Sequence, residues 1–276
     1  MTIMNTIVER LDGTRYDLEE LGITTRDFLV SAPSYKHETD SVEGRPGAVD
    51  LGTTDDVRKI DCSFYLKAQS METYARERDD IFHIFQSEEE FYITDTRVPY
   101  KRWLVKCNNS YGLDQQSFYG FFDVEFVANF PYAISTLNTI MPDFETYAQD
   151  AAYYGMGLNW ENELKYVHNT SYFKVLNAGN VHVNPRYMNF EIRYKGASNN
   201  LAIKNMTTGD IWSYNKTTSA NDVILLSGVR STKNSLSIFR DTNRKLITLA
   251  PGWNEFQLSG TTVPFEIQFG FDFYYR

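Results

Sequence analysis

The chain has 276 residues, of which 42% are hydrophobic and 23% charged, and its formal net charge is −9. This composition is that of a globular protein, and the length suits one large domain or two ordinary ones. A nucleic-acid-binding surface is not expected, because it needs clustered basic residues to displace counterions from phosphates. No run of about eighteen apolar residues and no signal-peptide pattern occurs, so we expect a soluble protein made in the cytoplasm.

Acidic residues concentrate in the first half of the chain. Residues 1–135 contain 24 acidic and 14 basic residues for a net charge of −10, whereas residues 136–276 contain 12 and 13 for +1. Such a difference suggests two domains with different roles. We predict an N-terminal domain at 1–135 and a C-terminal domain at 159–276. The linker between them, 136–158, has no clear hydrophobic period and contains one proline and two glycines.

A long polar segment lies early in the first domain. Residues 34–56 show no hydrophobic period and contain several turn-forming residues. The segment is too long for a simple connection, and loops of this length inside a compact domain are usually functional or disordered. We therefore predict an extended hairpin or arm that contacts another copy of the chain.

Two strands and one helix follow the polar segment. Apolar residues alternate along 58–68, which predicts a half-buried strand, and again along 118–130, where Pro131 ends the pattern. Between these strands, residues 70–87 have the spacing of an amphipathic helix with Ser70 as its N-cap, the only strong helix signal in the chain. The apolar stripe of this helix consists of Tyr74, Ile81, Phe82 and Phe85.

The C-terminal half shows strand patterns alone. Residues 188–195 alternate, and hairpins are predicted around 208–210 and 241–244. The segment Val175–Pro185 has turn residues at 177–180, and 265–275 place every second apolar residue on one face. We therefore predict a mainly β protein: an N-terminal β-sandwich-like domain with one α-helix and a long arm, followed by a C-terminal jelly-roll β-sandwich.

The sequence offers no catalytic or metal-binding pattern. The four histidines have no ligand spacing, no Cys-x-x-Cys occurs, and the nucleophile-elbow, P-loop and dinucleotide motifs are all missing. Cys62 and Cys107 lie in apolar runs, where two buried thiols are favoured over a disulfide or redox pair. We predict no catalytic residue, no metal and no cofactor, although a glycosidase with two carboxylates across one cleft is a further alternative.

Aromatic side chains raise a second hypothesis for the C-terminal domain. Trp160 and Trp212 lie in this half, and exposed aromatic rings on jelly rolls stack on sugars. A tryptophan after a hairpin turn also commonly covers the end of a sandwich core, and we favour that role for Trp212. The alternative function is a carbohydrate-binding module that helps to recognise the host cell wall.

Six segments in order resemble the distal tail protein (Dit) family of long-tailed siphophages. They are VEGRPGAVDLG (42–52), RVPYKRW (97–103), VEFVANFPYA (124–133), VLNAGNVHVNP (175–185), LAIKNMTTGD (201–210) and LITLAPGWNEFQLSG (246–260).

The resemblance implies a structural role and no enzymatic activity. Members of that family form hexameric rings at the distal end of the tail tube, with N-terminal domains in the ring and galectin-like C-terminal domains outside it. The expected location is the tail tip of the virion, after assembly in the host cytoplasm. Expected partners are the tail tube protein, a tail tip or tail-associated lysin protein, and receptor-binding proteins, while DNA only passes through the lumen and no membrane is involved.

The resemblance also gives the arm a place in the ring. Five arm residues match the family segment that forms a belt closing the ring: Glu43, Gly44, Arg45, Pro46 and Gly47. The family often has Gly-Arg-Asp-Gly where this chain has Gly-Arg-Pro-Gly, and proline stiffens the loop and removes a hydrogen-bond donor. If the acidic N-terminal half lines such a ring, six copies carry about −60, which would repel passing DNA.

Overall fold

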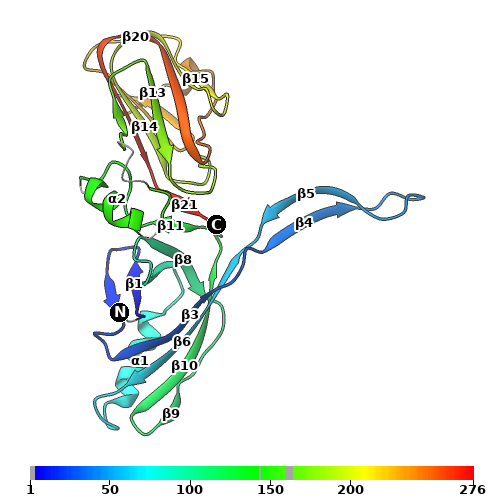
Figure 1. Cartoon of the computed structure of the whole chain (residues 1–276), viewed down its shortest axis with the longest axis vertical. Helices are drawn as coiled ribbons and strands as arrows, with labels where there is room; N and C mark the ends of the chain where they lie inside the picture. Colours follow the sequence, from blue (N-terminus) through cyan, green and yellow to red (C-terminus); the bar gives the residue numbers. More distant parts are fainter. Residues whose placement is uncertain (1–3, 143, 154, 159–163) are drawn as a thin grey trace. The chain divides into compact units, whose positions relative to one another are not determined.

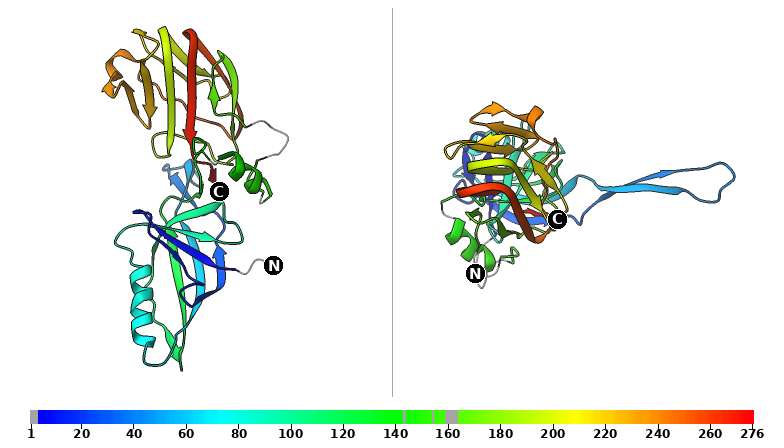
Figure 2. Two further views of the ribbon diagram at one scale, coloured as in Figure 1. Left: turned by 90° about the vertical axis from the view of Figure 1, so that its left-hand side faces the viewer. Right: turned by 90° about the horizontal axis from the view of Figure 1, so that it is seen from above.

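The computed structural model describes residues 4–142, 144–153, 155–158 and 164–276. The chain divides into two compact units. The first consists of Met1–Ile134 together with Arg276, and the second consists of Ser135–Tyr275. Figure 1 labels the helices and strands, and Figure 2 gives two further views.

The first unit is an antiparallel sheet with one helix and one detached hairpin. Its strands follow the order β2-β1-β7-β8-β10-β6-β3, β9 pairs with β10, and β4 with β5 forms a separate two-stranded sheet. The bounds are β1 (Thr6–Arg10), β2 (Arg15–Asp17), β3 (Ile23–Val30), β4 (Tyr35–Asp40), β5 (Val49–Asp55), β6 (Arg58–Lys67), α1 (Tyr74–Ile84), β7 (Phe91–Asp95), β8 (Lys101–Cys107), β9 (Asp114–Gln116), β10 (Tyr119–Ala128) and β11 (Ala133–Ser135).

The pairing of β6 with β10 carries the core of the first unit. The two strands are in register over their whole length, and the ring of Phe64 stacks on Phe122 at 5.3 Å between centroids. The predicted alternation is confirmed in both strands. The core side chains, all at most 4% exposed, are Ile60, Cys62, Phe64, Leu66, Phe122, Val124 and Phe126. Phe118 and Phe130 lie outside β10 and are half-buried, because the strand is shorter than its apolar pattern.

Helix α1 is shorter than the sequence predicts. Its N-cap is Thr73, and the predicted N-cap Ser70 lies one turn earlier, where its Oγ accepts a hydrogen bond from the Thr73 N–H at 3.3 Å. Tyr74 and Ile81 are buried as expected, but Phe82 is 40% exposed and does not belong to the apolar stripe. The true stripe continues through Ile84 to Phe85, both at most 4% exposed.

The second unit is also mainly β. The strands of its sheet follow the order β12-β20-β14-β17-β18-β19, with β13 pairing with β20, and β15 and β16 pairing with β14. The bounds are α2 (Phe144–Tyr153), β12 (Val167–His168), β13 (Tyr172–Asn177), β14 (Phe190–Asn205), β15 (Ile211–Ser213), β16 (Thr217–Thr218), β17 (Val223–Ser227), β18 (Arg230–Lys233), β19 (Leu236–Ser237), the 3₁₀ helix η1 (Phe239–Asp241), β20 (Gly252–Phe271) and β21 (Tyr274–Tyr275).

Helix α2 corrects the prediction of a single helix. It lies in 136–158, the stretch predicted as a linker, and belongs to the second unit. Its buried residues have the i, i+3, i+4, i+7 spacing of one helix face, which the neighbouring proline and glycines obscured. They are Phe144, Tyr147, Ala148 and Ala151, all at most 7% exposed.

The long strands β14 and β20 form the centre of the second unit. They pair from Phe190 and Phe271 to Asn205 and Phe256, with irregular register near Ser198. The predicted apolar face of 265–275 is confirmed, since its six members are at most 6% exposed: Phe265, Ile267, Phe269, Phe271, Phe273 and Tyr275.

The residues 177–180 form a local bend and not the predicted reversal of the chain, because Asn177 pairs with Gly252 and Val183 pairs with Leu249 further along in the same direction. One side chain holds the bend. The Asn177 amide donates to the Val181 carbonyl at 2.9 Å, and its oxygen accepts from the Gly179 N–H at 3.1 Å. The hairpin predicted around 241–244 is also wrong. That segment contains η1 and an isolated bridge between Tyr214 and Thr242.

Candidate functional site

The hairpin of β4 and β5 extends away from the sheet of the first unit (Figures 1 and 2). We call residues 35–55 the arm. The two strands pair from Tyr35 and Asp55 to Asp40 and Val49, which confirms the predicted hairpin. Every side chain from Tyr35 to Ala48 is exposed. The arm therefore buries no hydrophobic face within the described chain, and its backbone pairing is its main internal contact.

The arm presents apolar side chains to solvent. Glu38 faces Gly52 and Thr39 faces Asp50, so Leu51 is the extra residue of a β-bulge and is 63% exposed. Val42, near the tip, is 52% exposed. Large apolar side chains on a two-stranded hairpin lose contact with water only when another surface covers them. The arm thus presents apolar side chains that no other part of the described chain covers.

The predicted interface residues form the tip of the arm. Glu43, Gly44, Arg45, Pro46 and Gly47 connect the two strands, and the Arg45 N–H donates to the Val42 carbonyl at 3.1 Å. Gly44 and Gly47 have φ values of +81° and +80°, a backbone region that strains other residues. A Cβ at either position would meet nothing within 4 Å, so these glycines are required by backbone conformation and not by crowding.

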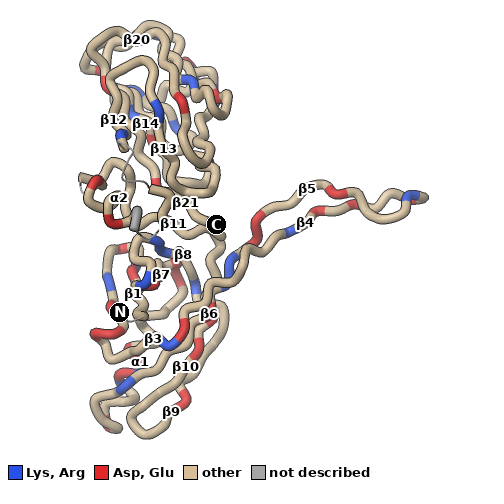
Figure 3. Tube along the Cα trace, in the orientation of Figure 1, with Lys and Arg blue, Asp and Glu red and all other residues tan. Residues whose placement is uncertain are grey.

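The arm is more acidic than basic, as its colouring shows (Figure 3). It carries five acidic and two basic residues. Since these side chains are exposed, their field is screened within about 8 Å at physiological salt. Charge therefore acts on a surface in direct contact with the arm. The charged residues are Lys36, Glu38, Asp40, Glu43, Arg45, Asp50 and Asp55.

Polar contacts fix the base of the arm. Asp55, the last residue of β5, accepts hydrogen bonds from the Tyr132 hydroxyl and from the guanidinium of Arg276, the latter at 2.8 Å. The buried Arg58 donates to the Ser31 carbonyl at 3.1 Å, on the opposite strand of the base. Burial lowers the pKa of Arg58, while the hydrogen bond to Tyr132 and the charge of Asp55 raise that of Arg276.

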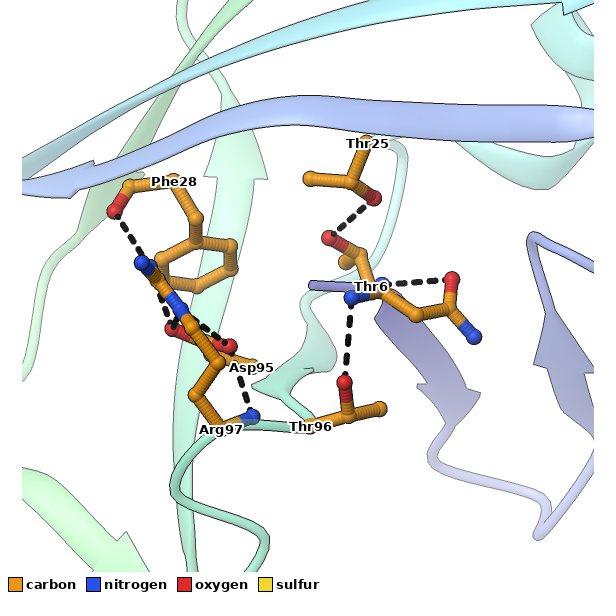
Figure 4. A network of polar contacts seen from close by, with 7 residues as sticks. Thr6, Thr25, Phe28, Asp95, Thr96 and Arg97 are labelled. Carbon is orange, nitrogen blue, oxygen red and sulfur yellow. Dashed lines mark hydrogen bonds and ion pairs between the residues drawn. The ribbon is translucent and has the colours of Figure 1, made fainter. Parts of the chain in front are cut away.

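A second polar network holds β3, the strand that leads into the arm (Figure 4). The Thr25 hydroxyl donates to the Thr6 hydroxyl at 3.0 Å, and both side chains are buried. Arg97 donates to the Phe28 carbonyl at 3.3 Å and lies 2.7 Å from the Asp95 carboxylate. The hydrogen bond to Asp95 raises the pKa of Arg97. These contacts connect β3 to β1 and to the β7–β8 loop, so the arm emerges from a fixed strand.

The predicted glycan contacts of Trp160 and Trp212 can be compared with the structure only for Trp212. Trp160 lies outside the described residues. Trp212 is only 1% exposed, and its indole N–H donates to the Ser231 hydroxyl at 3.2 Å. A stacking platform needs an exposed ring face, which Trp212 does not offer in this structure; its position is that of a core residue.

The described residues hold no group of three or more His, Cys, Asp or Glu side chains placed to bind a metal ion. Both cysteines are free: Cys62 is buried and Cys107 is half-buried. Burial raises the pKa of both thiols, which disfavours the reactive thiolate. Among the described residues, no helix has the length and apolarity needed to cross a membrane. The surface that stands out is the arm.

Comparison with known proteins finds a family match for the first unit. Residues 11–128, which include the arm, match the family model described as the phage tail protein RIFT-related domain. These residues, less than half of the chain, are similar to that family, and the similarity identifies the protein as a phage tail component. No curated protein matches the chain by sequence.

Solved structures extend the comparison to the whole chain. The Dit protein of phage SPP1, described as a paradigm of the hub adsorption apparatus in phages that infect Gram-positive bacteria, aligns with a TM-score of 0.69. The sequences are 14% identical, and the match covers 99% of this chain and 100% of that one. The family match in the first unit and this shared fold bear out the resemblance to siphophage distal tail proteins.

Chains from two baseplate structures of phage p2 in its activated conformation also align. The structure with Ca gives 9% identity over 99% of this chain and 98% of that one, and the structure with Sr gives 10% over 98% of each. Both TM-scores are 0.46, too low to support an argument.

The sequence revealed the arm but not its base. The polar run and its glycines were visible signals, whereas Asp55, Tyr132 and Arg276 are separated by 77 residues or more. No local pattern connects such positions. The length of the segment indicated an arm and gave no sign of the residues that hold its base.

Proposed function

We propose that this protein is a distal tail hub, a structural protein that assembles into a ring of six copies at the end of the tail tube and joins the tube to the tail tip. The observation that carries the proposal is the arm. It projects from a phage tail domain, is exposed along its length and displays Leu51 and Val42 to solvent. The fold shared with the SPP1 hub protein supports the same role.

The arm suits a closed ring for a physical reason. In a ring each subunit uses one surface to contact the next and a different surface to accept the previous one. A projecting hairpin with two unpaired edges and exposed apolar residues provides such a surface, and it can add strands or pack on a neighbour. We infer that the tip residues Glu43 to Gly47 and the bulge residue Leu51 contact the adjacent copy.

The proposed role is assembly without catalysis. The tail tube protein and a tip or lysin protein are the proposed neighbours on the two faces of the ring, receptor-binding proteins are further partners, and DNA passes through the lumen. The net charge of −10 in residues 1–135 supports an acidic lumen that repels DNA. A lumen lined by Lys and Arg would contradict this last point alone.

The first test is the mass of the purified full-length protein, measured by light scattering with negative-stain images of the same peak. A species of six times the 32.0-kDa chain, seen as rings, is expected. A variant in which residues 41–48 are replaced by Asn-Gly, a two-residue hairpin turn, should be folded and monomeric. A wild-type protein that stays monomeric at high concentration, with and without a tail tube partner, would overturn the ring.

A further inference from the structure

The second unit contains a groove that is bordered by basic side chains. Three adjoining hollows share lining residues. Pro185 and Arg230 line both one outer hollow and the central one, and Lys245 lines both the central hollow and the other outer one. The outer two have volumes of about 400 and 420 Å³, and a small one of about 20 Å³ shares lining residues with each of them. We call these three adjoining hollows the basic groove.

Separate parts of the chain build the two sides of the groove. On one side, the β17–β18 turn packs on the segment before β14: the Gly228 N–H donates to the Phe190 carbonyl at 3.2 Å, and a Cβ on Gly228 would lie 3.4 Å from the Pro185 carbonyl oxygen. On the other side, the Asn243 amide donates to the Ile211 carbonyl at 2.8 Å. One backbone hydrogen bond and one side-chain hydrogen bond therefore hold the two sides of the groove.

The floor between the outer hollows is apolar. Trp212, Phe190 and Leu226 line it, each at most 9% exposed, and the indole N–H of Trp212 is already bonded to Ser231. The role of Trp212 in the groove is thus to support the floor from below. Tyr187, which follows the lining residue Arg186 in the sequence, is 62% exposed.

Three cations border the groove without acidic partners. Arg186, Arg230 and Lys245 line it, and within the described part of the chain none of their side chains makes a hydrogen bond or an ion pair.

Asp210 lines one of the outer hollows, and Glu191 follows the lining residue Phe190 in β14; both carboxylates accept hydrogen bonds. Asp210 accepts from the Thr208 hydroxyl at 2.8 Å and from the Thr248 N–H at 3.0 Å. Glu191 accepts from the Ser227 hydroxyl at 2.6 Å. The charged lining residues are three cations, Arg186, Arg230 and Lys245, and one carboxylate, Asp210, so the net charge of the lining is positive although the chain as a whole is acidic.

We propose that the basic groove binds an anionic glycan, a sugar chain with carboxylate or phosphate groups. Three adjoining hollows suit a ligand of several units, and the cations that line them suit repeating anions. An acidic peptide usually adds to a free strand edge, but β14 and β17, which line the floor, are each paired on both sides. The proposal concerns a site other than the arm and does not depend on ring formation.

The test is titration calorimetry of the full-length protein with short ligands, which avoids the avidity of long polymers. The probes are hexagalacturonate and a phosphorylated mannan hexasaccharide, with neutral maltohexaose as the reference. At least one anionic probe should bind and maltohexaose should not. The double variant R230Q/K245Q should weaken binding at least tenfold. The control K174Q removes an exposed cation that is ion-paired with Glu255 at 2.8 Å, and its affinity should stay within twofold.

Several results would overturn the proposal. The proposal fails if neither anionic probe binds the wild-type protein. It also fails if K174Q and the double variant lose the same amount of affinity for the probe. Equally tight binding of hexaglutamate or of an oligodeoxynucleotide of equal charge would show a general polyanion surface and not a glycan site. Because Arg230 and Lys245 are exposed, the double variant should keep the circular dichroism spectrum and the oligomer mass of the wild type.

Discussion

Two antiparallel strand pairs of the first unit, β6–β10 and β4–β5, have the same kind of backbone pairing and different surroundings. In β6–β10 every second side chain is buried, with Phe64 and Phe126 fully excluded from water. In the arm the side chains from Tyr35 to Ala48 are exposed. An isolated two-stranded hairpin is marginally stable in water. Side-chain packing therefore stabilises the β6–β10 pair, whereas the stability of the arm rests on the contacts at its base and on any surface that binds over it.

The largest expected effect is on stability, where a substitution in β6–β10 should cost far more than one in the arm. Phe64→Ala removes a ring that contacts Phe85 and Phe122 at centroid distances of 5.6 and 5.3 Å. We expect the free energy of unfolding to fall by about 3–5 kcal/mol, because a buried cavity replaces the ring. Leu51→Ala in the arm should change it by less than about 0.5 kcal/mol. Urea unfolding followed by circular dichroism measures both, and equal effects would remove the contrast.

The next prediction concerns assembly, for which we expect the arm to matter more than the β6–β10 pair. Leu51→Asp should weaken association by about 2 kcal/mol, roughly thirtyfold, because a charge replaces an apolar contact residue. The melting temperature of the isolated chain should stay unchanged. Thr54→Asp, a substitution of an exposed residue in the same strand, is the matched control for added negative charge. Sedimentation at several concentrations gives the comparison, and wild-type assembly of the Leu51 variant would show that Leu51 makes no subunit contact.

The smallest effect sharpens the account of the arm's base. Arg276→Ala removes one of the two donors to Asp55. We expect a loss within about 1 kcal/mol, because the guanidinium is partly exposed, where ion pairs contribute little. Hydrogen exchange should nevertheless become faster in β4 and β5 while β6 and β10 stay protected. Unchanged exchange in the arm would mean that Tyr132 and the backbone pairing are sufficient.

Local periodicity predicted the parts of the fold that depend on one segment. The alternation in 58–68 and 265–275 identified strands. The residue types at 177–180 indicated a bend but not that the chain continues in the same direction after it. Helix α2 was missed although its buried residues have helical spacing, because the flanking Pro142 and Gly155 suggested a linker. The ends of α1 were misplaced because capping depends on backbone geometry that Ser70 and Thr73 could both satisfy.

Sequence reasoning was weaker for the candidate sites. The arm was found because its composition is unusual over a continuous stretch. The burial of Trp212 depends on Ser231, and the basic groove gathers Arg186, Arg230 and Lys245 from three separate segments. Such groupings arise from strand pairing across the sheet, which a single sequence does not encode in any local pattern.

The junction between β3, the arm and β6 has one more consequence. Val30 pairs with Ile60, the Ser31 N–H donates to the Lys59 carbonyl at 3.0 Å, and the Asp56 N–H donates to the Ser34 carbonyl at 2.9 Å. The arm is therefore an outgrowth of a hairpin that already exists. Adding residues in matched pairs lengthens it by about 3.4 Å per pair, and doubling a loop costs only about 0.6 kcal/mol of closure entropy. The length of the arm can therefore change without a change in the domain that carries it.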